Sequence, residues 1–130
     1  MAVEVVLDAS AILALLQFEP GADVVQSHLR GAAVSTVNIA EVGDSYLKRG
    51  GSRGELENAI LELSLTIVAP DPDLALDAAG LLFPTRSAGL SLGDRFCLAL
   101  CNRLGRPALT ADRAWRQISA ATGVEVILIR

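Results

Sequence analysis

The chain has 130 residues, 52% of them apolar, and a formal net charge of −4. This length and composition suit a folded domain with its own hydrophobic core and exclude a disordered tail. No apolar run reaches the roughly 20 residues of a membrane-spanning helix, and the first residues lack the features of a secretion signal, so we expect one cytoplasmic domain over residues 1–130. The negative charge argues against a protein that binds nucleic acid through bulk positive charge.

Short apolar runs alternate along the chain with segments of helical period. In chain order, we expect a strand at 3–8, helices at 9–18 and 22–29, a strand at 32–35, helices at 37–49 and 52–64, a strand at 65–69, a helix at 71–83, a helix beginning near Ser91, a strand at 107–110, a short helix at 112–123 and a strand at 124–129. In the helix at 37–49, the expected core stripe includes Tyr46 and Leu47. Strands that alternate with helices predict an α/β fold, a three-layer α/β/α sandwich with a mostly parallel central sheet.

The two cysteines and the basic residues indicate which kinds of site the chain can form. Cys97 and Cys101 are four residues apart in a helical pattern, with no nearby His to complete a zinc site, so we expect buried free thiols. Residues 86–116 contain six arginines and two acidic residues, so this stretch carries +4 and the remainder −8. Arginine suits forked contact with phosphate, although these arginines are equally typical of solvated helix surfaces.

Four acidic residues occupy positions where this fold binds ligands, the carboxyl ends of the strands. Asp8 ends the first strand and Asp112 follows the strand at 107–110, while Glu41 and Asp94 lie on helices. Each has a simpler interpretation. Asp8 and Asp112 suit helix N-caps, Asp94 suits a capping box with Ser91, and Glu41 suits a solvated helix position.

Taken together, the four acids point to a divalent cation. Mg²⁺ and Mn²⁺ prefer oxygen ligands and keep several waters, so a few carboxylates at a strand rim suffice. Such a cation lowers the pKa of a bound water and stabilises charge on a scissile phosphate, which removes the need for a histidine base. The reaction that suits this arrangement is hydrolysis of a phosphodiester.

Four motifs in the same order carry a family resemblance: "VVLDASAILALL", "STVNIAEV", "GLSLGDRFCLALC" and "LTADRAW". Together they closely resemble the PIN domain, specifically the VapC-type toxins of bacterial toxin–antitoxin modules, and the match covers essentially the whole chain. The resemblance implies a Mg²⁺- or Mn²⁺-dependent endoribonuclease, usually a homodimer, that a cognate antitoxin holds inactive.

The resemblance also implies roles for individual residues. Asp8, Glu41 and Asp94 match the core acids and Asp112 a more variable fourth. We expect Asp8 and Asp94 to ligate the cation, Glu41 to ligate it or position the attacking water, and Asp112 to serve a second, weaker metal position. Ser10, Asn38 and Thr110 are expected to support the site. From the sequence itself, we expect contacts to RNA phosphates by Arg86, Arg95 and Arg113, because they flank Asp94 and Asp112.

Two other classes of function remain open from the sequence. A sheet-rim aspartate such as Asp8 also occurs in phosphoacceptor and phosphatase-type α/β domains, although the phosphatase pattern places a second Asp where this chain has Ser10. The other alternative is a non-catalytic module that binds RNA without cutting it.

Overall fold

The computed structural model describes residues 2–130, which form a five-stranded sheet in the order β3-β2-β1-β4-β5. All four strand pairings are parallel. The strands are β1 (Val5–Leu7), β2 (Ala32–Ser35), β3 (Thr66–Val68), β4 (Ala108–Thr110) and β5 (Val126–Leu128). The chain adds strands on one side of β1 and then crosses to the other, so the topological switch point, where such folds bind ligands, lies at the end of β1.

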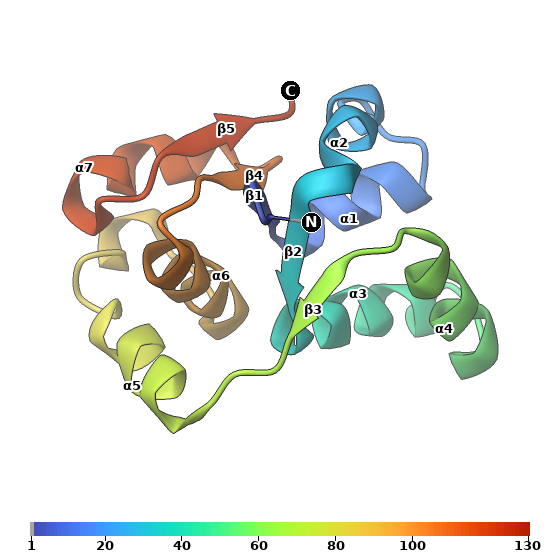
Figure 1. Ribbon diagram of the computed structural model, residues 1–130, viewed down its shortest axis with the longest axis horizontal. Helices are drawn as coiled ribbons and strands as arrows, with labels where there is room; N and C mark the ends of the chain where they lie inside the picture. Colours follow the sequence, from blue (N-terminus) through green and yellow to red (C-terminus); the bar gives the residue numbers. More distant parts are fainter. Residues whose placement is uncertain (1) are drawn as a thin grey trace.

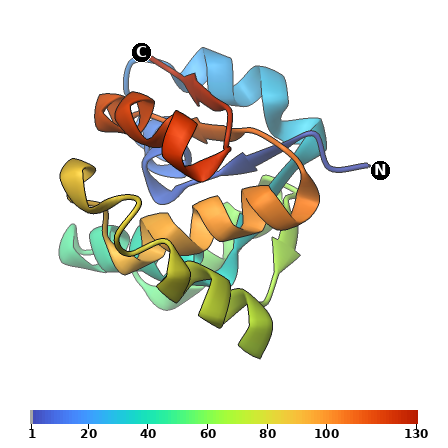
Figure 2. The same ribbon diagram turned by 90° about the vertical axis from the view of Figure 1, so that its left-hand side faces the viewer.

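Helices cover both faces of this sheet, as Figures 1 and 2 show. The α-helices are α1 (Ala9–Leu16), α2 (Ala22–His28), α3 (Thr36–Lys48), α4 (Arg53–Glu62), α5 (Pro72–Gly80), α6 (Leu92–Leu104) and α7 (Ser119–Thr122), and the 3₁₀ helices are η1 (Leu29–Gly31), η2 (Arg86–Ala88) and η3 (Arg113–Ile118). Helices α1 to α4 pack on one side of the sheet, and α5, α6 and η3 on the other. The predicted three-layer sandwich is therefore confirmed.

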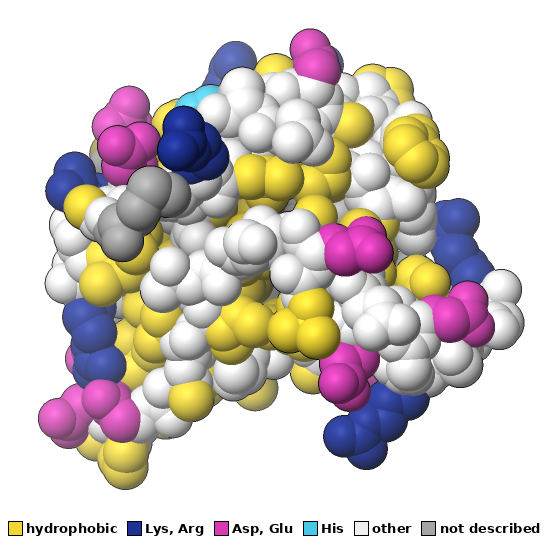
Figure 3. Space-filling view, turned by 45° about the vertical axis from the view of Figure 1, so that its right-hand side comes forward, with side chains coloured by type: hydrophobic (Ala, Val, Ile, Leu, Met, Phe, Trp, Pro, Cys, Tyr) yellow, Lys and Arg dark blue, Asp and Glu magenta, His cyan; other side chains and the backbone are white. Residues whose placement is uncertain are grey.

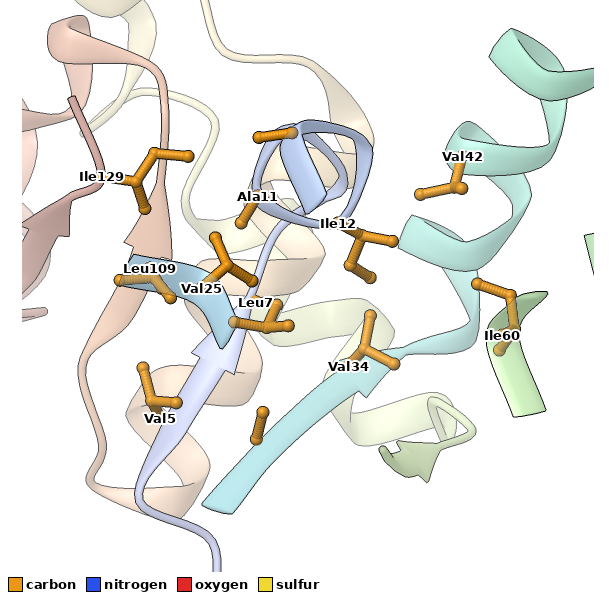
Figure 4. Packing of buried hydrophobic residues seen from close by; sticks show 12 residues of the cluster. Val5, Leu7, Ala11, Ile12, Val25, Val34, Val42, Ile60, Leu109 and Ile129 are labelled. Atoms are coloured by element: carbon orange, nitrogen blue, oxygen red, sulfur yellow. The ribbon is translucent and has the colours of Figure 1, made fainter. Parts of the chain in front are cut away.

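Alternation along the strands divides the core into two clusters. Val5 and Leu7 face the cluster that contains Ile12, whereas Val6 faces the cluster that contains Leu98. Successive strand residues point to opposite faces, which is why one short apolar run serves both layers. Figure 4 shows the first cluster, in which strand residues meet side chains from the covering helices. Each fully buried Leu or Val contributes about 1.5–3 kcal/mol relative to an exposed one.

Some elements differ in extent from the sequence-based expectation. The helix expected at 71–83 ends at Gly80, and the one expected at 112–123 is divided into η3 and α7. Leu47 was expected in the core and is instead 52% exposed. It lies in the last turn of α3, next to Tyr46, whose partly buried ring packs closely on Gly51.

The two thiols are buried, whereas several large apolar side chains are exposed on the surface. Cys97 and Cys101 are buried and free, as expected. Figure 3 shows one face on which hydrophobic side chains are exposed over the middle and Lys and Arg lie mostly toward the edges. Among the large apolar side chains exposed on the molecule are Phe18 at 91% and Phe83 at 72%. In residues 2–130, no helix has the length and apolarity needed to cross a bilayer.

Candidate active site

Asp8 lies at the carboxyl end of β1 and is the N-cap of α1. Its Oδ1 accepts hydrogen bonds from the backbone N–H of Ala11 at 2.9 Å and from the Ser10 hydroxyl at 2.7 Å. Its Oδ2 accepts a hydrogen bond from the Thr110 hydroxyl at the end of β4. The expected N-cap is therefore present, and two hydroxyl groups hold the same carboxylate from both sides.

Burial makes the charge on Asp8 costly. The residue is 2% exposed, and this burial raises its pKa to about 6, with a further contribution from the negative charge of Asp94. The three hydrogen bonds favour the ionised form and only partly offset the effect of burial. Perturbed carboxylates of this kind concentrate at functional sites.

Asp94 lies in the first turn of α6, where it forms the capping box with Ser91. The Ser91 hydroxyl accepts from the Asp94 N–H at 3.2 Å, and Asp94 Oδ2 accepts from the Ser91 N–H at 3.0 Å. The stripe behind it, including Cys97 and Leu98, is buried, while Asp94 itself is half-buried at the helix end. Burial raises the pKa of Asp94, and the charge of Asp112 raises it further.

Glu41 projects from α3 toward the start of α6 and is held there. Its Oε1 accepts from the Asn38 side-chain N–H at 2.8 Å, and its Oε2 accepts from the Ser91 hydroxyl at 3.4 Å. Asn38 is fully buried and also donates to the Gly93 carbonyl at 3.1 Å, so it joins α3 to α6. The pKa of Glu41 is raised, first by burial and also by Asp94. The solvated helix position considered above is therefore not what this side chain adopts.

Gly93 is the site residue that the sequence did not reveal. A Cβ at this position would overlap the Glu41 carboxyl group, so only glycine allows the carboxylate to lie against the α6 backbone. The available signal was a glycine directly before an acid in the first turn of a helix, where glycine is intrinsically unfavourable.

Asp112 follows β4 and is the exposed member of the group. Its Oδ1 accepts from the Ala114 N–H at 2.9 Å and caps η3. Its own N–H donates to the Thr110 hydroxyl at 3.0 Å, and the Ala111 N–H donates to the Ser10 hydroxyl at 2.9 Å. Ser10 and Thr110 therefore link the loop after β4 to Asp8.

The acids act on one another electrostatically, with Asp94 in the central position. Its charge raises the pKa of both Asp8 and Glu41, and its own pKa is raised by Asp112. Four segments distant in sequence thus bring four carboxylates to one rim of the sheet. Their mutual repulsion and burial favour either proton uptake or a bound cation.

The donor set fits a hard divalent cation in its chemistry. The four acidic side chains offer oxygen atoms only, the ligand type of Mg²⁺ and Mn²⁺. In residues 2–130, no three Asp, Glu, His or Cys side chains are arranged as a ready-made metal cage. Mg²⁺ is usually held by one or two carboxylates, waters and substrate phosphate, so pairs such as Asp8 with Asp94 match its ordinary mode of binding.

The three arginines that were expected to contact RNA phosphates make three different contacts within the protein. Arg95 is half-buried and donates to the Ala78 carbonyl of α5 at 3.2 Å. Arg86 lies over the ring of Phe83, 5.7 Å from its centroid. Arg113 donates from Nε to the main-chain oxygen of Arg130 at 3.4 Å and lies directly after Asp112. Of the three, Arg113 therefore adjoins the loop that carries an acid of the site.

The chain is similar to known proteins in sequence and in fold. A family model described as the PIN domain matches residues 5–121. The ribonuclease VapC of Mycolicibacterium smegmatis is 32% identical over a match of length 126, and the match covers 89% of this chain and 97% of the relative. FitAB bound to an IR36 DNA fragment has a TM-score of 0.73 at 19% identity, covering 96% of this chain and 94% of that one. DNA-bound VapBC from Salmonella typhimurium has a TM-score of 0.70 at 14% identity, covering 98% and 99%.

The two structural likenesses concern the fold, since both lie well below the identity at which function transfers. The family match covers most of the chain and spans the motifs that carry Asp8, Glu41 and Asp94. The relative from Mycolicibacterium adds identity over nearly the whole length. The chain therefore belongs to the PIN domain family and, within it, to the VapC group.

Proposed function

We propose that this chain is a Mg²⁺- or Mn²⁺-dependent endoribonuclease that hydrolyses RNA phosphodiesters and acts as the toxin of a toxin–antitoxin pair. The observation that carries the proposal is the position of Asp94, whose charge acts on Asp8 and Glu41 while Asp112 acts on it. The VapC ribonuclease relative supports the substrate class. In this proposal residues 1–130 work as one cytoplasmic nuclease domain.

Each acid has a distinct part in the proposed chemistry. Asp8 and Asp94 would hold the cation directly or through water, and Asp112 would contribute to a second position that fills with substrate. When bound, the cation would lower the pKa of the attacking water and stabilise the negative charge that develops on the phosphate. Glu41, held by Asn38 and Ser91, would orient that water toward the phosphorus atom.

The polar neighbours of Asp8 would keep its carboxylate ready for a cation. Ser10 and Thr110 donate to it from opposite sides and so restrict its rotation. Asn38 plays the same part for Glu41. Side chains fixed before the substrate arrives need no reorganisation during the reaction, which is the main advantage of such supporting contacts.

The partners follow from the same family membership. Two of the structural neighbours are described as DNA-bound VapBC from Salmonella typhimurium and a toxin–antitoxin complex from Klebsiella pneumoniae. We propose that this chain likewise forms a homodimer and binds a cognate antitoxin.

The decisive experiment measures cleavage of a mixture of structured and single-stranded RNA by the purified chain, freed of any bound antitoxin. We expect cleavage with Mg²⁺ or Mn²⁺, 5′-phosphate and 3′-hydroxyl ends, and no activity in EDTA. Asp94→Asn should abolish cleavage, whereas Asp77→Asn, the same change at an exposed position of α5, should leave it intact. Cleavage that persists in EDTA or in Asp94→Asn would contradict the proposal.

Two results would favour the alternatives, one from this experiment and one from a separate phosphorylation assay. RNA that binds and stays uncut with metal present would indicate a non-catalytic module. Acid-labile phosphate on Asp8 after treatment with acetyl phosphate would indicate a phosphoacceptor.

A further inference from the structure

A pocket of about 380 Å³ lies beyond the carboxyl end of β5, and its polar lining is arginine. The residues that line it are Arg113, Arg116, Leu128, Ile129 and Arg130. Leu128 and Ile129 supply an apolar floor, and the three guanidinium groups come from two different segments. The whole chain has a net charge of −4, so this pocket does not belong to a generally basic surface. Its positive charge is concentrated at one place by the fold.

The fold brings these arginines together from the segments that follow two neighbouring strands, β4 and β5. Arg113 and Arg116 are three residues apart on η3, and a 3₁₀ helix has three residues per turn, so both lie on one side of it. Arg130 arrives through β5, which pairs in parallel with β4. The Ile129 N–H donates to the Thr110 carbonyl at 3.0 Å and anchors the segment after β5 to the active-site loop.

The charges of the pocket are unequally compensated. Arg130 lies 3.5 Å from Glu19 and donates to the Pro20 carbonyl at 2.8 Å, so its charge is partly neutralised. In residues 2–130, no Asp or Glu side chain forms an ion pair with Arg113 or Arg116, and the Nε–H of Arg113 donates to the main-chain oxygen of Arg130 at 3.4 Å. Both are exposed, and the N–H groups of a guanidinium fork suit the oxygens of a phosphate.

The pocket lies on the same rim of the sheet as the acids. Parallel strands end on one side, and β1, β4 and β5 are neighbours in that order (Figure 1). Asp8 after β1, Thr110 at the end of β4 and the pocket after β5 therefore follow one another along that rim. Two strand spacings separate β1 from β5, which is about 10 Å. A nucleic-acid strand that presents one phosphate to the acids therefore has neighbouring phosphates within reach of the pocket.

Resting on the proposed endoribonuclease function, we propose that Arg113 and Arg116, with Arg130 beside them, bind a backbone phosphate of the RNA next to the one that is cut. The pocket thereby sets the direction in which the RNA strand crosses the site, from the acids toward β5. Arg86 and Arg95 do not line the pocket and take no part in this contact.

The test measures binding of a fluorescein-labelled single-stranded RNA in EDTA by fluorescence anisotropy, over a series of salt concentrations. Arg113→Ala/Arg116→Ala should raise Kd about tenfold. The slope of log K against log salt should become shallower by about 0.7 for each phosphate that the protein no longer neutralises. Arg113→Lys/Arg116→Lys should recover part of the affinity, because the charge is kept and the fork is removed. Any affinity tag belongs at the N-terminus, since a C-terminal tag would begin at the pocket.

The matched control is Arg30→Ala/Arg106→Ala, which removes the same charge from two exposed arginines that precede β2 and β4 at the opposite rim. This control should leave Kd and the salt slope nearly unchanged. Equal weakening by both double variants, or no weakening by Arg113→Ala/Arg116→Ala, would overturn the pocket proposal. Because EDTA removes cleavage from the measurement, selective weakening would support the pocket even if the chain failed to cut RNA with Mg²⁺ or Mn²⁺.

Discussion

Asp8 and Asp112 lie at the same rim of the sheet, at the ends of neighbouring strands, in opposite surroundings. Asp8 is 2% exposed, and two hydroxyl groups and a backbone N–H donate to it. Asp112 is exposed, and one backbone N–H donates to it. Three donors hold the first carboxylate on both of its oxygens before any ligand binds, whereas a single donor holds the second on one oxygen. The site therefore combines a rigid part, next to the core, with an adjustable part, next to solvent.

The strongest test of this contrast compares two substitutions of the same kind. Asp8→Asn should lower kcat/KM for RNA cleavage by about 10³-fold, because several kcal/mol of charge stabilisation in the transition state depend on a fixed carboxylate. Asp112→Asn should lower it only about tenfold, since an exposed charge acts through water at about 1 kcal/mol. Equal losses in the two variants would remove the distinction between a rigid and an adjustable part.

The buried position of Asp8 also predicts a pH dependence of stability in the metal-free protein. Its pKa is raised to about 6 in the folded chain, so the folded state binds more protons than the unfolded state between about pH 4 and 6. The free energy of unfolding should therefore rise as the pH falls through this window, by about 1 kcal/mol from pH 7 to pH 5. Urea unfolding at the two pH values measures it.

The control for this pH effect is Asp8→Asn, which has no charge to lose at position 8. Its gain in stability between pH 7 and pH 5 should be smaller than that of the unaltered chain by about 1 kcal/mol. Binding of Mn²⁺ should change in the opposite direction and weaken below about pH 6, because protons and the cation compete for the same carboxylate. An unchanged pH dependence in Asp8→Asn would show that Asp8 ionises normally.

Glu41 lies between the two extremes, and Gly93 tests how firmly it is held. Gly93→Ala would place a Cβ against the Glu41 carboxyl group and should turn it away, lowering the cleavage rate about tenfold or more. Gly80→Ala is the matched control, because Gly80 is also helical and a Cβ there meets open space. It should raise the free energy of unfolding by about 0.5 kcal/mol and leave cleavage unchanged. Full activity of Gly93→Ala would mean that the position of Glu41 is unimportant.

The smallest expected effect separates helix capping from support of the site. Ser52 and Ser91 both form capping boxes, with Glu55 and Asp94 respectively. Ser52→Ala and Ser91→Ala should each cost about 1 kcal/mol of stability. Only Ser91→Ala should also slow cleavage, by a few-fold, because the Ser91 hydroxyl donates to Glu41. If both variants cleave RNA at the unaltered rate, Ser91 serves as a cap alone.

The sequence predicted most elements of the fold and the four acids, with identifiable exceptions. The strand at 32–35 has the expected bounds, because its apolar run is short and the Ser35 cap follows directly. The prediction that Leu47 lies in the core was wrong, because helical period alone does not show at which residue a helix extends beyond the core. The functional roles assigned to the acids and to Ser10, Asn38 and Thr110 remain predictions, for which the structure supplies the contacts.

The arginines show a second limit of sequence reasoning. Arg86, Arg95 and Arg113 were chosen because they flank acids in sequence, yet Arg95 donates to α5 and Arg86 lies over Phe83. Arg130, which follows β5, meets Arg113 at the same pocket. A position close to an acidic residue in sequence does not predict where a long side chain points, because the elements packed around the side chain decide its direction.

Local sequence patterns were sufficient for the order of strands and helices, for the caps at Asp8 and Ser91, and for the oxygen-only character of the acids. These features depend on neighbouring residues, so apolar period and residue type predict them. Three features required the tertiary structure: the burial that raises the pKa of Asp8, the close approach of Glu41 to Gly93, and the arginine pocket. Each arises where chain segments far apart in sequence meet. Neighbouring residues in the sequence do not determine which distant segments meet, so local patterns could not predict these features.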